Sequence, residues 1–507
     1  MQEDKGLFQL ISSLSATEKR YFKLFAQRHV VGDTNDYVLI FDAIDDQASQ
    51  GDVYEEQAVL EKLKAAGRKP ALRAAKSYLS ALILRSMRQF ADEANTTRQL
   101  EARLHDIHFL LEKGLVNKAM AVLRKSRKMA AFYEKPQLLL ELLATERKIV
   151  RLQQTRHTET LLNQLEADEN LAMAQLQTEL ELRRLYDRLH LHIRSARQQP
   201  AAARAEIVSE FLRNALLRKR SPTHTFSAEV LRLNTLSDLA VLAGDHKKSR
   251  SHLQRLMNHY EAQPHQLRDE VLRYINVLNN YLTSCFQLRM FDEFSAVIQK
   301  MKALENTSRE VRYQVFRNGA FLELLYLMNM RRLDEGLQLL PEIENGLRMF
   351  ERKLPVARML SFTYNVVVLY FLHERFSDAL RALNLLRRRE HPDVRRDIQH
   401  AARLFQLILH FELGRNDDFL ETLMRSTQRH LREHNLFGKF EQWLFRTLRN
   451  LQETTGERDK KQVFATALEE HKELANSGAR DLLIDETGLW LISRSTGKSL
   501  RDVFANL

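Results

Sequence analysis

Residues that interrupt helices are scarce along this chain, which has 15 Gly and 8 Pro among its 507 residues. Average proteins carry about 7% Gly and about 5% Pro. In a helix interior these residues cost roughly 1 and 3 kcal/mol relative to Ala. A chain that avoids both over such a length is predicted to be all-α. Because a single core stops growing near ~250–300 residues, we also expect several domains or an extended array of packed units.

A turn with the same pattern recurs from about residue 101 onward. An apolar helix ends, a short turn with Gly or a polar pair follows, and a second apolar helix begins. The turns with this pattern start at Gly114, Gly244, Arg289, Arg331, Glu374 and Gly414. The last five are 45, 42, 43 and 40 residues apart. The first two are 130 residues apart, which leaves room for two degenerate units between residues 145 and 230.

These turns resemble the Gly-x-Tyr-x-x-Ala turn of tetratricopeptide repeats; Ala119 and Ala379 hold the last position in two of them. The resemblance implies a right-handed helix–turn–helix superhelix, an α-solenoid in which each helix pair buries its apolar face against the next. The match is partial. The steps exceed the about 34 residues of that family, and its consensus Trp, Leu-Gly and Pro positions are missing.

The chain is predicted to have three parts. Residues 1–100 form an N-terminal helical region, residues 101–475 the repeat array, and residues 476–507 a C-terminal cap. The last part begins where Asn476-Ser477-Gly478 interrupts a helix, and it carries a small apolar cluster at residues 489–492. We expect this cluster to cover the end of the array.

The N-terminal region opens with a recognisable joint between two helices. Ser15 and Glu18 have the spacing of a capping box, in which each side chain accepts the other residue's backbone N–H. The surrounding pattern consists of Phe8, Ile11, Ser13, Leu14, Ser15, Glu18, Lys19, Arg20, Tyr21, Phe22, Lys23 and Phe25. This pattern resembles the start of an uncharacterised family of bacterial helical proteins. The resemblance implies family membership and no activity.

The chain is basic, with a formal net charge of +12. This balance favours anionic partners, so a nucleic-acid-associated regulator is the second hypothesis, with residues 56–90 or basic clusters as the contact. The clusters are 124–128, 387–389 and 395–396. The competing interpretation is a solvated helical surface, because basic and acidic residues alternate along the helices.

Cysteine use and hydropathy point to a soluble, cytoplasmic protein. The only cysteine, Cys285, cannot form an internal disulfide. The first twenty residues lack the pattern of a secretory signal. The longest apolar run, Val366 to Leu372, is shorter than the ~18–20 residues that span a bilayer.

Asparagines recur at fixed distances before the turns. In tetratricopeptide-like arrays the first helix of each pair lines a groove, and the family's peptide-binding Asn commonly occupies the positions of Asn280 and Asn365. Asn both donates and accepts hydrogen bonds, and Arg recognises carboxylates. The predicted groove residues are Arg273, Asn276, Asn280, Asn318, Arg358, Ser361 and Asn365. We expect them to hold a peptide or protein partner; the alternative is that they are ordinary solvated or inter-helix polar residues.

One string could carry chemistry. His430, Glu433 and His434 have the H-x-x-E-H spacing of inverted zinc metalloproteases. A third ligand is required, and no downstream glutamate has a distinguishing context. We therefore expect a non-enzymatic binding or scaffold protein with no metal or cofactor, and a zinc hydrolase is the most remote alternative.

Overall fold

The computed structural model describes residues 2–27, 36–50, 54–65, 72–91, 95–153, 157–196, 200–305, 308–351, 353–387, 394–476 and 482–506. Over these residues every regular element is a helix, which confirms the predicted all-α class. None of the helices in this part of the chain is both long and apolar enough to cross a membrane.

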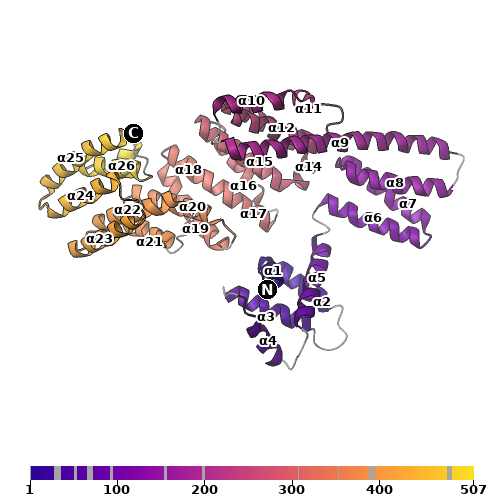
Figure 1. Ribbon diagram of the computed structural model, residues 1–507, viewed down its shortest axis with the longest axis horizontal. Helices are drawn as coiled ribbons and strands as arrows, with labels where there is room; N and C mark the ends of the chain where they lie inside the picture. The colour runs from indigo at the N-terminus through magenta and orange to yellow at the C-terminus, as the bar shows by residue number, and fades with distance from the viewer. Residues whose placement is uncertain are drawn as a thin grey trace. The chain divides into compact units, whose positions relative to one another are not determined.

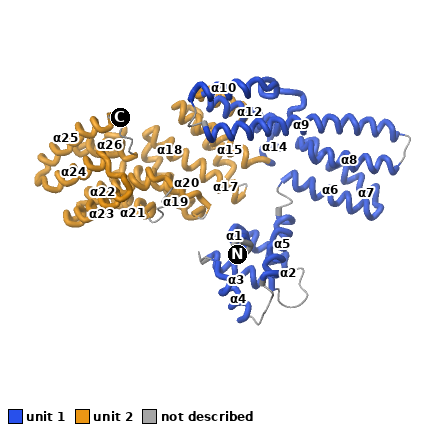
Figure 2. Tube along the Cα trace, viewed as in Figure 1, with its two compact units in different colours: residues 1–243, 258–269 blue, residues 244–257, 270–507 orange. Residues whose placement is uncertain are grey.

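The chain divides into two compact units (Figure 2). Unit 1 comprises residues 1–243 and 258–269, and unit 2 comprises residues 244–257 and 270–507; α13 (His246–Glu261) contributes to both. The other helices of unit 1 are α1 (Gln2–Ser13), α2 (Ala16–Gln27), α3 (Asp36–Gln50), α4 (Glu56–Ala65), α5 (Leu72–Ala91), α6 (Thr96–Glu112), α7 (Val116–Phe132), α8 (Pro136–Gln153), α9 (Thr158–Ala196), α10 (Ala201–Leu212), α11 (Ala215–Arg218), α12 (Phe226–Leu242) and α14 (Pro264–Asp269).

Helices α1–α5 share one hydrophobic core, in which Ile11, Phe22 and Phe41 are fully buried. The joint between α1 and α2 is the predicted capping box. Ser15 N–H donates to Glu18 Oε2 at 2.6 Å, and Glu18 N–H donates to Ser15 Oγ at 3.2 Å. This local signal was therefore read correctly from the sequence.

The span between residues 145 and 230, where two degenerate units were expected, is dominated by α9, a helix of 39 residues. The shorter helices α10 and α11 follow it, and α8 and α12 extend into the span from either side. The physical reason for the length of α9 is that residues 158–196 contain neither Gly nor Pro, so nothing in this stretch ends the helix. Helix α9 packs along α8 and α12 instead of turning back on itself.

Unit 2 is a succession of helices that pack on their neighbours in chain order (Figure 1). Contacts also join α18 to α20, α20 to α22, and α22 to α24, so alternate helices meet as well. Besides its part of α13, the unit consists of α15 (Val271–Leu288), α16 (Phe294–Lys302), α17 (Arg309–Val315), the π-helix η2 (Phe316–Ala320), α18 (Phe321–Asn329), α19 (Leu333–Met349), α20 (Val356–Leu372), α21 (Phe376–Arg387), α22 (Arg396–Glu412), α23 (Asp417–Glu433), α24 (Lys439–Glu453), α25 (Glu457–Asn476), α26 (Ile484–Thr496) and α27 (Leu500–Ala505).

The six turns identified from the sequence share one backbone conformation. Their first residue is left-handed in every case, with φ between 52° and 78° for Gly114, Gly244, Arg289, Arg331, Glu374 and Gly414. In five of them the N–H of the following residue donates to the carbonyl five residues earlier, as Arg332 does to Leu327 at 2.8 Å. This is the Schellman ending of a helix. The same ending occurs at Glu134 and Asn435, which the sequence pattern did not reveal.

The C-terminal helices reach back along unit 2. Helix α26 packs on α25, and α27 contacts α20. Arg494 pairs with Glu374 in one turn, and Arg501 pairs with Asp334 in the first turn of α19. Of the predicted break at residues 476–478, Ser477 and Gly478 lie outside the described residues. The segment thus touches elements well before the last helix pair.

Candidate functional site

The predicted groove residues on α15 are exposed. Asn276, Asn280 and Arg273 follow one side of the helix at spacings of three and four residues. Arg273 pairs with Glu270 at 3.2 Å, and the amide oxygen of Asn280 accepts a hydrogen bond from Asn279 at 3.3 Å. These side chains remain accessible to a partner.

The corresponding residues further along the chain are more enclosed. Asn318 lies in the π-helix and is only 4% exposed. Ser361 is 8% exposed; its hydroxyl donates to the Ala357 carbonyl and accepts from Arg395 at 2.7 Å. Asn365 donates to the Ser361 carbonyl at 2.8 Å, so the structure brings these two predicted residues together.

Arg358, the last predicted groove residue, lies against an aromatic ring. Its guanidinium carbon is 4.4 Å from the centroid of Phe321. Burial, with the neighbouring charge of Arg317, lowers the pKa of Arg358. A desolvated cation stacked on a ring stabilises the packing of α18 on α20.

A crevice opens between α19, α20 and α21, on a different side of α20 from these residues. Its volume is about 360 Å³. The α20 residues that line it are Met359, Thr363, Val366 and Tyr370, spaced as one helical stripe. Leu347 from α19 and Leu385 from α21 extend the apolar floor. The charged residues of the rim are Glu344, Arg348, Glu351, Asp378 and Arg381.

Tyr370 of α20 forms a hydrogen bond across this crevice to α19. Its hydroxyl donates to Glu344 on α19 at 3.0 Å. Burial and this hydrogen bond raise the pKa of Tyr370 to about 12, so the hydroxyl remains a donor at neutral pH. Arg375 lies over the ring, 5.0 Å from its centroid, and donates to Asp378 at 2.7 Å.

The same arrangement occurs one helix pair earlier. A second crevice, of about 380 Å³, is lined by residues of α16, α18 and α19. Here Arg332 lies 6.0 Å from the ring of Tyr326 and donates to Glu335 at 2.5 Å. The arginine and the acid occupy the same positions after the turn in both pairs. Successive helix pairs therefore repeat side-chain contacts as well as turn geometry.

No family model, curated protein or solved structure matches this chain.

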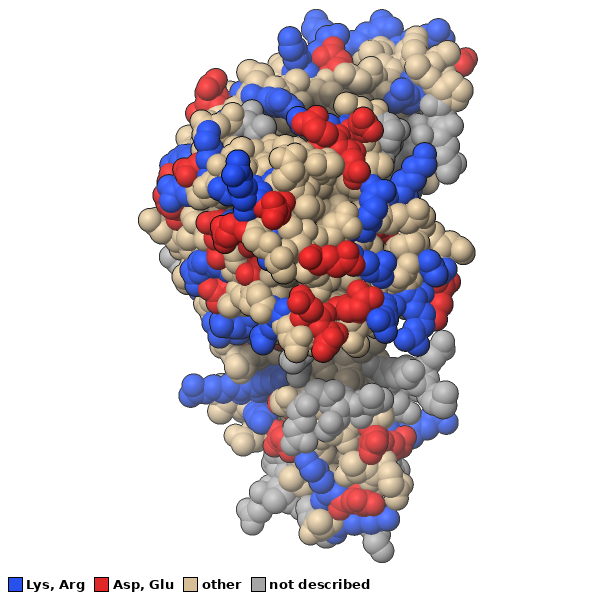
Figure 3. All heavy atoms as spheres, turned by 90° about the vertical axis from the view of Figure 1, so that its left-hand side faces the viewer, with Lys and Arg blue, Asp and Glu red and all other residues tan. Residues whose placement is uncertain are grey.

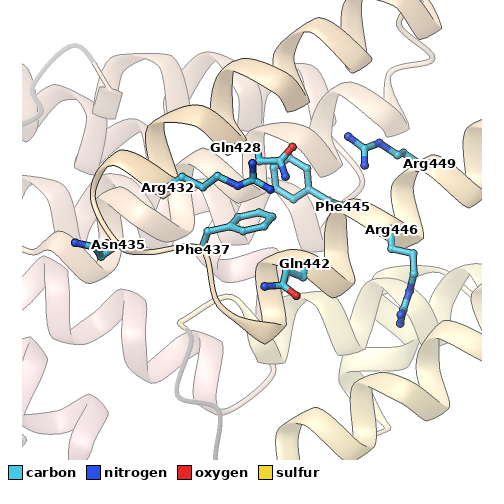
Figure 4. Close-up of a pocket in the computed structure, with 8 residues that line it drawn as sticks. All are labelled: Gln428, Arg432, Asn435, Phe437, Gln442, Phe445, Arg446 and Arg449. Atoms are coloured by element: carbon cyan, nitrogen blue, oxygen red, sulfur yellow. The ribbon is translucent and has the colours of Figure 1, made fainter.

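A third cavity, which we call the arginine pocket, lies between α23 and α24 and has a volume of about 710 Å³. Three arginines, three amides and two phenylalanines line it: Gln428, Arg432, Asn435, Phe437, Gln442, Phe445, Arg446 and Arg449. Figure 4 shows Arg432 extending from α23 over Phe437, toward Gln428 and Phe445. Arg446 extends away from that group and pairs with Glu470 at 2.7 Å.

The H-x-x-E-H string lies at the end of α23, beside this pocket. The rings of His430 and His434 are 4.4 Å apart between centroids. Within the described ranges, no group of three or more His, Cys, Asp or Glu side chains is placed to hold a metal ion. Among these described residues, the two histidines thus lack a third side chain placed to bind zinc with them.

Sequence reasoning missed both the α19–α21 crevice and the arginine pocket. Helix α20 is buried on almost every side, and such a helix packs on more than one face; that was the available signal for the crevice. For the arginine pocket the signal was charge, because residues 425–449 contain six Lys or Arg and two Glu. The basic clusters singled out earlier lie elsewhere in the chain.

Proposed function

We propose that this chain is a non-enzymatic binding protein that holds a segment of a partner protein in the α19–α21 crevice. The observation that carries the proposal is an open cavity of about 360 Å³ with an apolar floor and a charged rim. Binding sites combine these two features, since apolar contact supplies affinity and a few polar groups fix orientation.

The floor suits apolar side chains presented at helical spacing. In the floor, Met359 contributes a flexible thioether, and Val366 and Leu385 contribute branched aliphatic side chains. Leu385 is 52% exposed, so its apolar surface is available to a partner. One face of an amphipathic helix would fill such a groove, and rim charges of both signs would pair with its flanking residues.

We further propose that the helix pairs of unit 2 continue as a right-handed, tetratricopeptide-like superhelix. The recurring left-handed turns and the packing of alternate helices support this arrangement. Repetition follows from burial, because each pair covers an apolar face that its neighbour cannot cover alone. The division into residues 1–100, 101–475 and 476–507 stays a prediction that accompanies this proposal.

The nucleic-acid hypothesis is weaker, because many of its basic residues have partners within the chain. Arg127 pairs with Glu146 at 2.9 Å and also with Asp168. Arg395 pairs with Asp397 at 2.7 Å. Of the remaining candidates, Arg388, Arg389 and residues 66–71 lie outside the described residues. A paired cation must exchange its carboxylate for a phosphate, which reduces its net contribution to binding a nucleic acid.

The proposal is tested by placing a charge in the crevice of the full chain. Leu385→Glu changes an exposed side chain, so the fold should persist. When an apolar segment of the partner binds, the new carboxylate becomes buried, and this burial weakens binding. We expect recovery of the principal partner from cell extract to fall about tenfold, measured by quantitative mass spectrometry. Leu152→Glu is the matched control, because Leu152 is 76% exposed on α8. Equal recovery by both variants would remove the crevice as the binding site.

A further inference from the structure

We propose that the arginine pocket is a second binding site, which takes the carboxylate side chains of an acidic peptide segment. The pocket is built by α23, α24 and the turn between them. None of its residues lines the α19–α21 crevice, so the inference goes beyond the proposed function and does not rest on it.

Arg432 is the central donor of the site. Its guanidinium carbon lies 5.2 Å from the ring centroid of Phe437, which supports one face of the cation. Stacking leaves the N–H groups at the edge of the guanidinium plane available. In the described part of the chain no acidic side chain forms a salt bridge with Arg432. A planar guanidinium fixed in this way favours a bidentate carboxylate.

The charge of the residues around Arg432 also favours a carboxylate ligand. Residues 425–449 contain six Lys or Arg and only two Glu. One of these, Glu441, is 6% exposed and is engaged with the Gly438 N–H and with His400, both at 2.7 Å. The chain segment that builds the pocket therefore carries a positive excess. The amides of Gln428, Asn435 and Gln442 add donors for the carbonyls of a bound peptide.

A peptide fits these observations better than a nucleic acid does. Arg446 pairs with Glu470 at 2.7 Å, and Arg449 lies 3.5 Å from Glu421, so two of the three arginines of the pocket already have an acidic partner. On the face drawn in Figure 3, Lys and Arg are interspersed with Asp and Glu. Affinity for a nucleic-acid backbone grows with the number of phosphates that cations neutralise. Separate carboxylates spaced along a peptide need only one cationic pocket.

The test measures binding of a fluorescein-labelled hexaglutamate peptide to the full chain by fluorescence anisotropy at low ionic strength. We expect Arg432→Gln to raise the Kd about tenfold, as expected for loss of a charge-assisted bidentate contact. Arg432→Lys keeps the charge but loses the planar fork, so we expect an intermediate effect. Gln442→Glu, an exposed substitution that adds a negative charge to the pocket, should weaken binding in the same way.

Arg458→Gln is the matched control, because it removes the same charge from an exposed arginine of α25 outside the pocket. Its Kd should stay within about twofold of the unchanged chain, and a hexaglutamine peptide should not bind. The proposal is overturned if the unchanged chain does not bind hexaglutamate. It is also overturned if Arg458→Gln weakens binding as much as Arg432→Gln does. The same holds if hexauridylate RNA binds more tightly than hexaglutamate and its binding depends equally on Arg432.

Discussion

Arg494 and Glu412 form a two-pronged ion pair that joins α26 to α22. Arg494 Nε donates to Glu412 Oε1 at 2.9 Å, and Nη2 donates to Oε2 at 2.6 Å. The indole N–H of Trp490 donates to the same Oε1 at 2.6 Å. The Glu412 side chain is only 9% exposed, so one enclosed carboxylate satisfies two side chains of the C-terminal segment.

Replacing Glu412 by Ala should detach this segment. The substitution leaves the buried Trp490 N–H without its acceptor and takes two hydrogen bonds from Arg494, which keeps its pair with Glu374. We expect a cost of about 2 kcal/mol, because Arg494 keeps some solvent contact. We expect a lower urea midpoint and earlier proteolytic cleavage within residues 476–507. The comparison is Arg501→Ala, whose pair with Asp334 is more than half exposed and contributes roughly 0–1 kcal/mol. Equal shifts for both variants would contradict the assigned role of Glu412.

Asp238 on α12 should make unit 1 less stable as pH rises. Burial raises the pKa of Asp238 to about 6, although His190 at 3.6 Å opposes this shift. In the unfolded chain an Asp loses its proton near pH 3.9. Between about pH 4 and 6 the folded state therefore holds a proton that the unfolded state has released, and stability falls as pH increases through this window.

Asp238→Asn removes this titration. We expect the variant to be more stable than the unchanged chain by about 3 kcal/mol at pH 8, where the partly buried carboxylate is ionised. At pH 4, where Asp238 is protonated, the variant and the unchanged chain should have similar stability. Thermal melting followed by circular dichroism at both pH values measures the difference. A gain of the same size at pH 4 would show that the amide acts through packing and not through charge.

At the left-handed turn positions, adding a glycine and removing one should change the stability of unit 2 in opposite directions. Arg289 has φ 52°, a conformation that costs non-glycine residues roughly 1–2 kcal/mol, so Arg289→Gly should stabilise unit 2 by about 1 kcal/mol. Gly414 has φ 61°, and a Cβ there would meet no atom within 4 Å. Gly414→Ala should therefore destabilise by about 1 kcal/mol through backbone strain alone. Urea unfolding midpoints check both signs, and a destabilising Arg289→Gly would contradict them.

Mutation can distinguish binding at the predicted groove residues from binding in the α19–α21 crevice. Asn280→Ala combined with Asn365→Ala removes two predicted peptide contacts, one exposed and one bonded to the Ser361 carbonyl. If the partner occupies the α19–α21 crevice, recovery with this double variant should stay within about twofold of the unchanged chain. A loss comparable to that of Leu385→Glu would instead favour the groove predicted from the sequence.

Local signals were readable from the sequence because they involve residues close together in the chain. The Ser15–Glu18 capping box depends on residues three apart, and both of its hydrogen bonds are present. The six turns were found from short patterns, and each begins with a left-handed residue. The length of a helix was harder to predict, because it depends on the absence of an ending signal. Residues 158–196 contain neither Gly nor Pro, and α9 runs through all of them as one helix.

The sequence by itself determined that this protein is all-α and where many of its helix pairs turn, because helix propensity and capping act within a few residues. Only the tertiary structure decided which side of α20 faces a crevice, and that Glu412 receives Arg494 from 82 residues away. It also decided that Arg432 lies on Phe437 while Arg446 turns to Glu470. These contacts depend on how whole helices pack, and packing joins residues that no local pattern connects.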